Sequence, residues 1–292
     1  MSIFTGCGTA LITPFQKNGS LDEPTLKKLV RRQIEAGIHF LVPCGTTGES
    51  PTLTHEEHLR VVELTVAEAK GQVPVLAGAG GYNTADVISL AKELEALGVD
   101  GLLSVTPYYN KPTQEGLYQH YKALAKAVKI PIIVYSVKGR TGVNVEPSTL
   151  KRLAAIKNIV GVKEASGDIA QIARVIHEVP ESFDVLSGDD IATIPLMALG
   201  GKGIISVAGN QIPGEMANLA EACLNQDFAT ARAIQGRFAD LMDINFVESN
   251  PIPVKAMMAD MGLCKAIWRL PLVPPSDGAL EKIRQVRTQV GI

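Results

Sequence analysis

Short apolar runs alternate with amphipathic stretches along most of the chain. Each run is five or six residues long and rich in Val, Ile or Leu, which is typical of parallel strands covered on both faces. Strict alternation of strands and helices implies right-handed crossovers and one parallel sheet. The predicted strands are Thr9–Thr13, Phe40–Cys44, Val73–Ala77, Gly101–Thr106, Pro131–Tyr135, Ile159–Lys163, Phe183–Ser187 and Gly203–Val207.

Eight repeats of this kind predict an α/β protein with a (β/α)8 TIM barrel, because eight strands close the sheet on itself. The rival architecture is an open doubly wound sheet, which would carry a glycine fingerprint after its first strand. Thr13-Pro14-Phe15 stands there instead, and the glycines of Gly78–Gly81 miss the required spacing because position 83 is Asn. The pattern therefore favours the barrel.

Residue patterns that predict helix starts and ends lie between the apolar runs. Thr54 followed by Glu57 is a capping-box pattern, and Asn83 can cap a segment that ends before Gly98.

Beyond the last strand the chain reads as helix throughout, from about Ile212 onward. Asp227–Ile244 is amphipathic, and Asn250-Pro251 begins a further helix. We expect residues 1–224 to form the barrel and residues 225–292 to form a C-terminal helical extension. No flexible linker separates the two, so the extension should pack on the barrel and not be independent.

Composition excludes several classes of protein. The 292 residues are 46% apolar and 20% charged, and their net charge of −2 comes from 28 basic and 30 acidic residues. No basic run indicates a nucleic acid or membrane partner, and the apolar runs are too short to span a bilayer. The N-terminus lacks the pattern of a signal peptide. These features predict a soluble protein of the cytoplasm.

Neither cysteines nor histidines form a metal-site pattern. The four cysteines are scattered without a CxxC motif and are expected to be reduced. His55 and His58 stand three residues apart but lack the HExxH arrangement and a third ligand. No metal site is expected.

Lys163 is the most informative of the residues at the strand ends, where barrels of this kind place their active sites. Alternation along its strand can point it into the barrel mouth. Burial there would favour the neutral amine, which attacks carbonyl groups. Alternatively, Lys163 leaves the strand end and pairs with Glu164.

Other polar residues gather at the same predicted edge. Tyr135 can transfer protons, or it can be a hydrogen-bonded rim residue. Thr46 and Thr47 stand between two glycines and can bind a carboxylate, although an ordinary turn would look the same. Arg140, in the loop after the fifth strand, can clasp a second carboxylate or remain solvated.

Seven motifs in order give a resemblance to the dihydrodipicolinate synthase family that covers nearly the whole chain. The superfamily also holds N-acetylneuraminate lyase and keto-deoxy-sugar aldolases. The motifs are ALITPF (Ala10–Phe15), GTTGES (Gly45–Ser50), VTPYYNKP (Val105–Pro112), GRTG (Gly139–Gly142), GVKEASGD (Gly161–Asp168), LSGDD (Leu186–Asp190) and NPIPVK (Asn250–Lys255).

The resemblance implies a role for each site residue. Lys163 would form an imine with pyruvate. Tyr135 would be the general acid and base, relayed through Thr46 to Tyr109, which in the family reaches the neighbouring subunit. The protein would thus be a homo-oligomer, usually a tetramer built as a dimer of tight dimers. Thr46 and Thr47 would hold the pyruvate carboxylate, Arg140 would bind that of aspartate semialdehyde, and Gly188 and Ile205 would line the site.

The implied reaction makes 4-hydroxy-tetrahydrodipicolinate, at the first committed step of diaminopimelate and lysine biosynthesis. It needs no metal or organic cofactor, because the imine itself withdraws electrons. The resemblance also implies a possible allosteric lysine site. Its residues would be Ser50, Pro51, His55, His58, Tyr82, Asp86 and Tyr108.

The chain departs from the family pattern after the fifth strand. The family usually reads YNVPxRTG, whereas Ser136 and Lys138 stand here in place of Asn and Pro. Some 4-hydroxy-2-oxoglutarate aldolases also carry this Ser. An aldolase for that substrate or for a 2-keto-3-deoxy acid is therefore the alternative. A catalytically silent, metabolite-binding barrel is a third possibility, against which the intact lysine and tyrosines argue.

Overall fold

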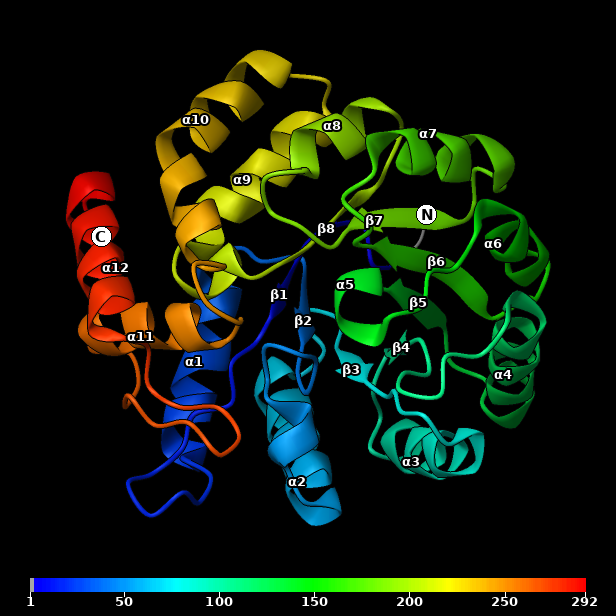
Figure 1. Cartoon of the computed structure of the whole chain (residues 1–292), viewed down its shortest axis with the longest axis horizontal. Coiled ribbons are helices and arrows are strands. Elements are labelled where there is room, and N and C mark those ends of the chain that lie inside the picture. The colour runs from blue at the N-terminus through cyan, green and yellow to red at the C-terminus, as the bar shows by residue number, and fades with distance from the viewer. Residues whose placement is uncertain (1–2) are drawn as a thin grey trace.

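The computed structural model describes residues 3–292 and has a barrel of eight parallel strands at its centre (Figure 1). The strands hydrogen-bond in the order β2-β1-β8-β7-β6-β5-β4-β3, and an isolated parallel bridge between Leu41 and Val75 joins β2 to the segment before β3. The predicted (β/α)8 barrel is confirmed. The strands are β1 (Gly6–Ala10), β2 (Phe40–Val42), β3 (Leu76–Gly78), β4 (Gly101–Val105), β5 (Ile132–Ser136), β6 (Ile159–Glu164), β7 (Asp184–Ser187) and β8 (Gly203–Ser206).

Helices surround the barrel, and α10, α11 and α12 lie together on one side of it (Figure 1). The α-helices are α1 (Glu23–Glu35), α2 (His55–Ala69), α3 (Thr84–Ala96), α4 (Gln114–Ala127), α5 (Lys138–Thr141), α6 (Pro147–Ala154), α7 (Ile169–Glu178), α8 (Thr193–Ala198), α9 (Pro213–Leu224), α10 (Phe228–Ile244), α11 (Ile252–Asp260) and α12 (Asp277–Val290). Two short 3-10 helices are η1 (Ser50–Thr52) and η2 (Ala208–Asn210). The division of the chain at residue 224 stays a prediction.

Alternation along each strand produces two apolar clusters. In β5, Ile133 and Tyr135 belong to the cluster inside the barrel, whereas Ile132 and Val134 belong to the cluster between strands and helices. Residues of both clusters are buried, as expected of a parallel sheet covered on both faces. Among residues 3–292 no helix is both long and apolar enough to cross a membrane.

The predicted helix signals are confirmed. Thr54 accepts a hydrogen bond from the Glu57 amide (3.2 Å), and the Glu57 carboxylate accepts one from the Thr54 amide (3.0 Å). Asn83 accepts from the Ala85 amide (3.1 Å), and Gly98 follows α3 with a left-handed φ of 83°.

Two predicted elements differ most from the structure, and β3 also begins three residues after the predicted Val73. β1 begins and ends three residues before the predicted Thr9–Thr13, because Gly6–Ala10 carries the ladder to β8 and β2. Beyond β1 the chain bonds to loops, through the Ile12 amide and Asn210 Oδ1 (3.1 Å). The helix predicted throughout the C-terminal part is interrupted at residues 261–276. Gly262 adopts a φ of 76° there, and prolines that lack an N–H group follow.

We predict that Thr54→Ala lowers the free energy of unfolding by roughly 1 kcal/mol, because it removes one half of the capping box. Urea-induced unfolding followed by circular dichroism measures the change. Thr54→Ser keeps the hydroxyl and is the matched control. Equal losses in the two variants would show that the cap hydrogen bond is not responsible.

Candidate active site

Lys163 and Tyr135 lie side by side because β5 and β6 pair in parallel with these two residues in register. Lys163 Nζ is 4.4 Å from the centroid of the Tyr135 ring, and the two residues are only 5% and 7% exposed. Their neighbours Val134 and Val162 pack outward against the helices. The structure thus brings together, inside the barrel, an amine and a phenol from adjacent strands.

Glu164 does not pair with Lys163. Its carboxylate accepts hydrogen bonds from Gln171 Nε2 (2.7 Å) and from the Ser166 amide (3.2 Å), so it is bound to the segment leading into α7 and to α7 itself. The alternative in which Lys163 leaves the barrel for Glu164 is therefore wrong.

A cavity of about 150 Å³ opens above these two side chains at the carboxyl ends of the strands. Ala10, Val42 and Leu103 give it an apolar floor. Ile205 does not line it and is fully buried in β8. Six predicted site residues line the cavity: Thr46, Thr47, Tyr135, Arg140, Lys163 and Gly188.

Contacts on two sides fix the turn that carries Thr46 and Thr47. Thr47 is buried, and its Oγ1 accepts a hydrogen bond from Asn250 Nδ2 at 2.9 Å. Thr13 Oγ1 donates to the Gly48 carbonyl at 2.6 Å. A Cβ on Gly48 would lie 3.1 Å from the Cys44 backbone, so this position favours glycine. Two hydroxyls are thereby held at the rim of the cavity, as carboxylate binding requires.

Arg140 lies in the short helix α5, not in the predicted loop. Its side chain is at the mouth of the cavity, where Nη2 donates to the Asn250 carbonyl at 3.2 Å. Residue Arg140 as a whole is exposed. Helix α5 is followed by Gly142, whose φ of 70° is left-handed. An exposed guanidinium at the mouth can meet a second anionic group after the first has entered.

Ser136 and Lys138 are the two departures from the family pattern, and neither residue lines the cavity. The Ser136 hydroxyl accepts a hydrogen bond from the Val145 amide (3.2 Å), and the residue does not line the cavity. Strand alternation explains this, because Tyr135 faces inward. Lys138 is the exposed first residue of α5.

Gly188 leaves space for the lysine side chain. A Cβ at this position would lie 2.6 Å from Ala165 Cβ and 3.2 Å from Lys163 Cε. Asp189 follows in the cavity wall, and burial raises the pKa of its carboxyl group.

Asn250 and Phe246 also line the cavity, and the sequence did not predict a role for either. Asn250 contacts both Thr47 and Arg140 from a segment about 200 residues away from the turn. The only sequence signal was its place at the start of the NPIPVK motif.

Tyr109 does not face the cavity of its own chain. It is 92% exposed and adopts a left-handed φ of 67°. Its neighbour Tyr108 packs edge-on against Tyr82, with ring centroids 5.4 Å apart. The structure therefore does not bring Tyr109 to Thr46 within one chain.

A second cavity of about 190 Å³ adjoins the first, and Thr46 and Tyr135 line both. Four residues of the predicted lysine site line the second cavity: Ser50, Pro51, His58 and Tyr108. His58 is buried with Nε2 2.9 Å from the Gly78 carbonyl, and burial lowers its pKa.

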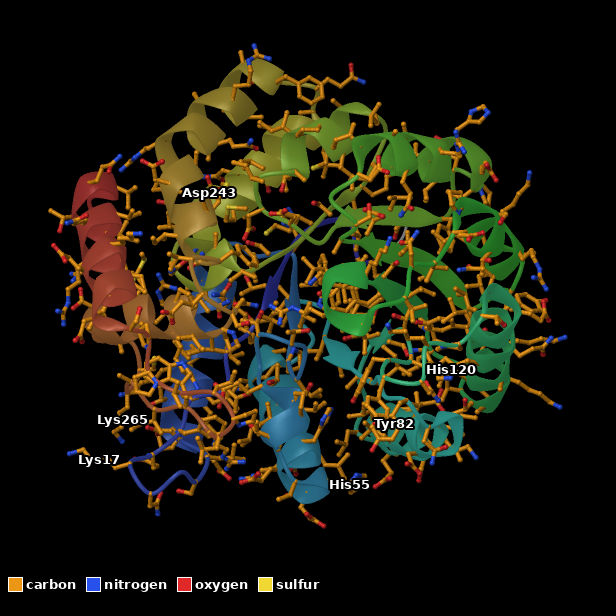
Figure 2. The ribbon with its side chains drawn as sticks, in the orientation of Figure 1. Lys17, His55, Tyr82, His120, Asp243 and Lys265 are labelled. Atoms are coloured by element: carbon orange, nitrogen blue, oxygen red, sulfur yellow. The ribbon has the colours of Figure 1, made fainter. Side chains whose placement is uncertain are left out.

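The other three residues of that predicted set lie outside the second cavity. His55 pairs with Glu93 (2.9 Å), Tyr82 is exposed, and Asp86 accepts a hydrogen bond from Asn83 (2.9 Å). Figure 2 shows His55 on α2 and Tyr82 beside α3. Lysine binding stays a prediction.

Among the described residues no group of three His, Cys, Asp or Glu side chains could hold a metal ion.

Comparison with known proteins agrees with this geometry. A 4-hydroxy-tetrahydrodipicolinate synthase of Koribacter versatilis (strain Ellin345) is 52% identical over 288 residues, which cover 98% of this chain and 96% of the relative. The dihydrodipicolinate synthase of Acinetobacter baumannii, solved with pyruvate, superposes with a TM-score of 0.97 at 44% identity and 99% coverage of both chains. A dihydrodipicolinate synthase variant described as monomeric gives a TM-score of 0.97 at 45% identity, covering 99% of this chain and 97% of the variant. The Dihydrodipicolinate synthetase family matches residues 3–290, and this chain belongs to that family.

Proposed function

We propose that this protein is a lyase that binds pyruvate as a Schiff base on Lys163 and condenses it with L-aspartate 4-semialdehyde. The product is 4-hydroxy-tetrahydrodipicolinate, an intermediate of diaminopimelate and lysine biosynthesis. The observation that carries the proposal is the buried pair of Lys163 and Tyr135, which lines the cavity. The Acinetobacter baumannii relative, solved with pyruvate, supports the first substrate.

The chemistry follows from an amine beside a proton donor. The Lys163 amine adds to the C2 carbonyl of pyruvate, and loss of water gives the imine. The imine withdraws electrons, so that a proton leaves C3 and an enamine forms. The enamine carbon attacks the aldehyde carbon, and the new oxyanion takes up a proton. The amino group of the semialdehyde then attacks the imine carbon, which closes the ring and releases the Lys163 amine. We assign these proton transfers to the Tyr135 hydroxyl, because its ring lies against Lys163 Nζ.

The two carboxylates of the substrates have separate partners in this proposal. Thr46 and Thr47 hold that of pyruvate near Lys163, and Arg140 binds that of the semialdehyde at the mouth. Gly188 gives the imine room beside Lys163. Because Ser136 faces away from the cavity, its replacement of Asn does not alter the wall that the aldehyde meets. Ser136 therefore gives no reason to prefer the alternative 4-hydroxy-2-oxoglutarate and 2-keto-3-deoxy acid substrates over the semialdehyde.

Tyr109 is proposed to complete the active site of a neighbouring subunit in a homo-oligomer. Its exposure and its absence from the lining of its own cavity support this role. A tetramer built as a dimer of dimers stays a prediction, and one related synthase variant is described as monomeric. A cytoplasmic location also stays a prediction.

Lys163→Ala is expected to abolish condensation and the trapping of pyruvate by borohydride. Among the described residues no other lysine lines the cavity. An assay of semialdehyde consumption and mass spectrometry of the reduced protein measure the two losses. Full labelling of the variant would refute the assignment of Lys163.

Arg140→Ala is expected to raise the Michaelis constant for aspartate semialdehyde about tenfold and that for pyruvate much less. A charge-assisted hydrogen bond contributes roughly 1.5 kcal/mol at the lower end of its range, which suits an exposed guanidinium. Steady-state kinetics with each substrate varied in turn measures both constants. Arg140→Lys is the control, because it keeps the positive charge but lacks the paired N–H donors of the planar guanidinium group. Equal increases for both substrates would contradict the role.

Mixing two inactive variants tests the shared site. A dimer of Tyr109→Phe with Lys163→Ala contains one site in which both residues are native. Random mixing should then restore about a quarter of the wild-type activity, because half of the dimers are mixed and each mixed dimer has one native site out of two. Activity is measured after dissociation and reassociation of the mixture. A mixture no more active than its separate components would place Tyr109 outside the neighbouring site.

A further inference from the structure

Lys255 of α11 and Glu49 form an ion pair whose two side chains are completely buried. We propose that this pair is a positioning device. It holds the turn that carries Thr46 and Thr47 and thereby sets the place of the pyruvate carboxylate. The inference rests on the proposed function, in which that turn binds pyruvate. Neither residue lines the cavity, so both would act through the turn.

Three contacts hold the Lys255 ammonium group. Its Nζ donates to Glu49 Oε1 and to the Ile267 carbonyl (2.9 Å), and it lies 4.3 Å from the centroid of the Phe15 ring. The second carboxylate oxygen of Glu49 accepts the Arg269 amide at 3.4 Å. The pair therefore joins three segments: the turn, α11 and the non-helical stretch after α11.

The turn needs such an anchor because its backbone is unfavourable at both ends. Cys44 before it and Glu49 after it both have a left-handed φ of 54°. Residues other than glycine adopt this conformation at a cost, and surrounding contacts must hold them there. Release of Glu49 would let the backbone next to Thr47 and Gly48 relax.

The same C-terminal segment holds the turn at a second point. Asn250, just before α11, donates to Thr47 Oγ1 at 2.9 Å. Anchors at Thr47 and Glu49 define both the position and the direction of the turn. Because carboxylate binding depends on the direction of hydroxyl and N–H groups, small displacements of the turn should weaken it.

Residues 261–276 support the ion pair from outside. Arg269 donates to both oxygens of Glu57 (2.5 and 2.6 Å) and to the Gly19 carbonyl (2.9 and 2.7 Å). Lys265 pairs with Asp22 at 3.2 Å. Figure 2 shows Lys265 on the same side of the molecule as Lys17, close to the loop before α1. The stretch is thus bound to the barrel although it has no regular structure.

Stability alone does not account for a fully buried ion pair. Desolvation of two charges opposes their attraction, and apolar residues of similar size often stabilise a protein equally well. Burial also lowers the pKa of Lys255. An ion pair differs from apolar packing in direction, since it fixes the carboxylate of Glu49 at a defined point. This property is what positioning of the turn requires.

The test compares Glu49→Gln, Lys255→Met and the double variant with the wild type. The concentration of pyruvate that gives half-maximal borohydride trapping is measured together with the midpoint of thermal unfolding. Each single variant should unfold at a lower temperature, and the double variant should recover most of that loss because no unpaired charge remains buried. The half-saturating concentration of pyruvate should rise about tenfold in all three, including the double variant.

Arg31→Met with Glu68→Gln is the matched control. This pair joins the far ends of α1 and α2 with Nε–Oε2 at 2.7 Å and lies away from the cavity. It should leave pyruvate trapping unchanged.

Three outcomes separate the possibilities. A double variant that traps pyruvate with the wild-type half-saturation would overturn the positioning role. Absence of trapping in the wild type would overturn the proposed function itself, and this inference with it. If the double variant does not fold, Glu49→Asp tests the inference instead, because it keeps the negative charge but shortens the side chain by one methylene group. An unchanged half-saturation in Glu49→Asp would overturn the inference.

Discussion

The register between β5 and β6 is the constraint on which the active site depends. It places Tyr135 opposite Lys163, and strand alternation turns both side chains into the barrel while Val134 and Val162 face the helices. A slip of one residue would reverse the two faces and send the lysine outward. Inside the barrel the amine lies against the Tyr135 ring and among apolar side chains.

In the proposed mechanism, the other residues of the site arrange the substrates around that lysine. The glycine at 188 leaves room for a covalent adduct, the turn at Thr46 and Thr47 offers hydroxyls on one side, and Arg140 offers a cation at the entrance. The C-terminal part of the chain contributes through contacts at the mouth, because Asn250 joins the turn to Arg140. A barrel supplies the rigid strands, and its surrounding segments determine which molecules reach them.

The sequence was sufficient where the structure depends on local pattern. Alternation predicted eight strands and placed Lys163 and Tyr135 at adjacent strand ends, and the capping residues predicted two helix starts. Apolar character alone could not separate Gly6–Ala10 from the buried residues that follow, so the first strand was misplaced. Contacts between distant segments, such as Asn250 with Thr47, leave no periodic signal. The proposed role of Tyr109 depends on a surface that another subunit would supply.

The most direct test of the account is the site of covalent attachment. The wild-type protein is incubated with pyruvate, reduced with borohydride and digested, and each peptide is weighed by mass spectrometry. The account predicts a pyruvate-dependent mass increase on the peptide that contains Lys163, whereas the peptide with the buried Lys255 stays unlabelled. An unlabelled Lys163 peptide, or label on another lysine, would contradict the central claim.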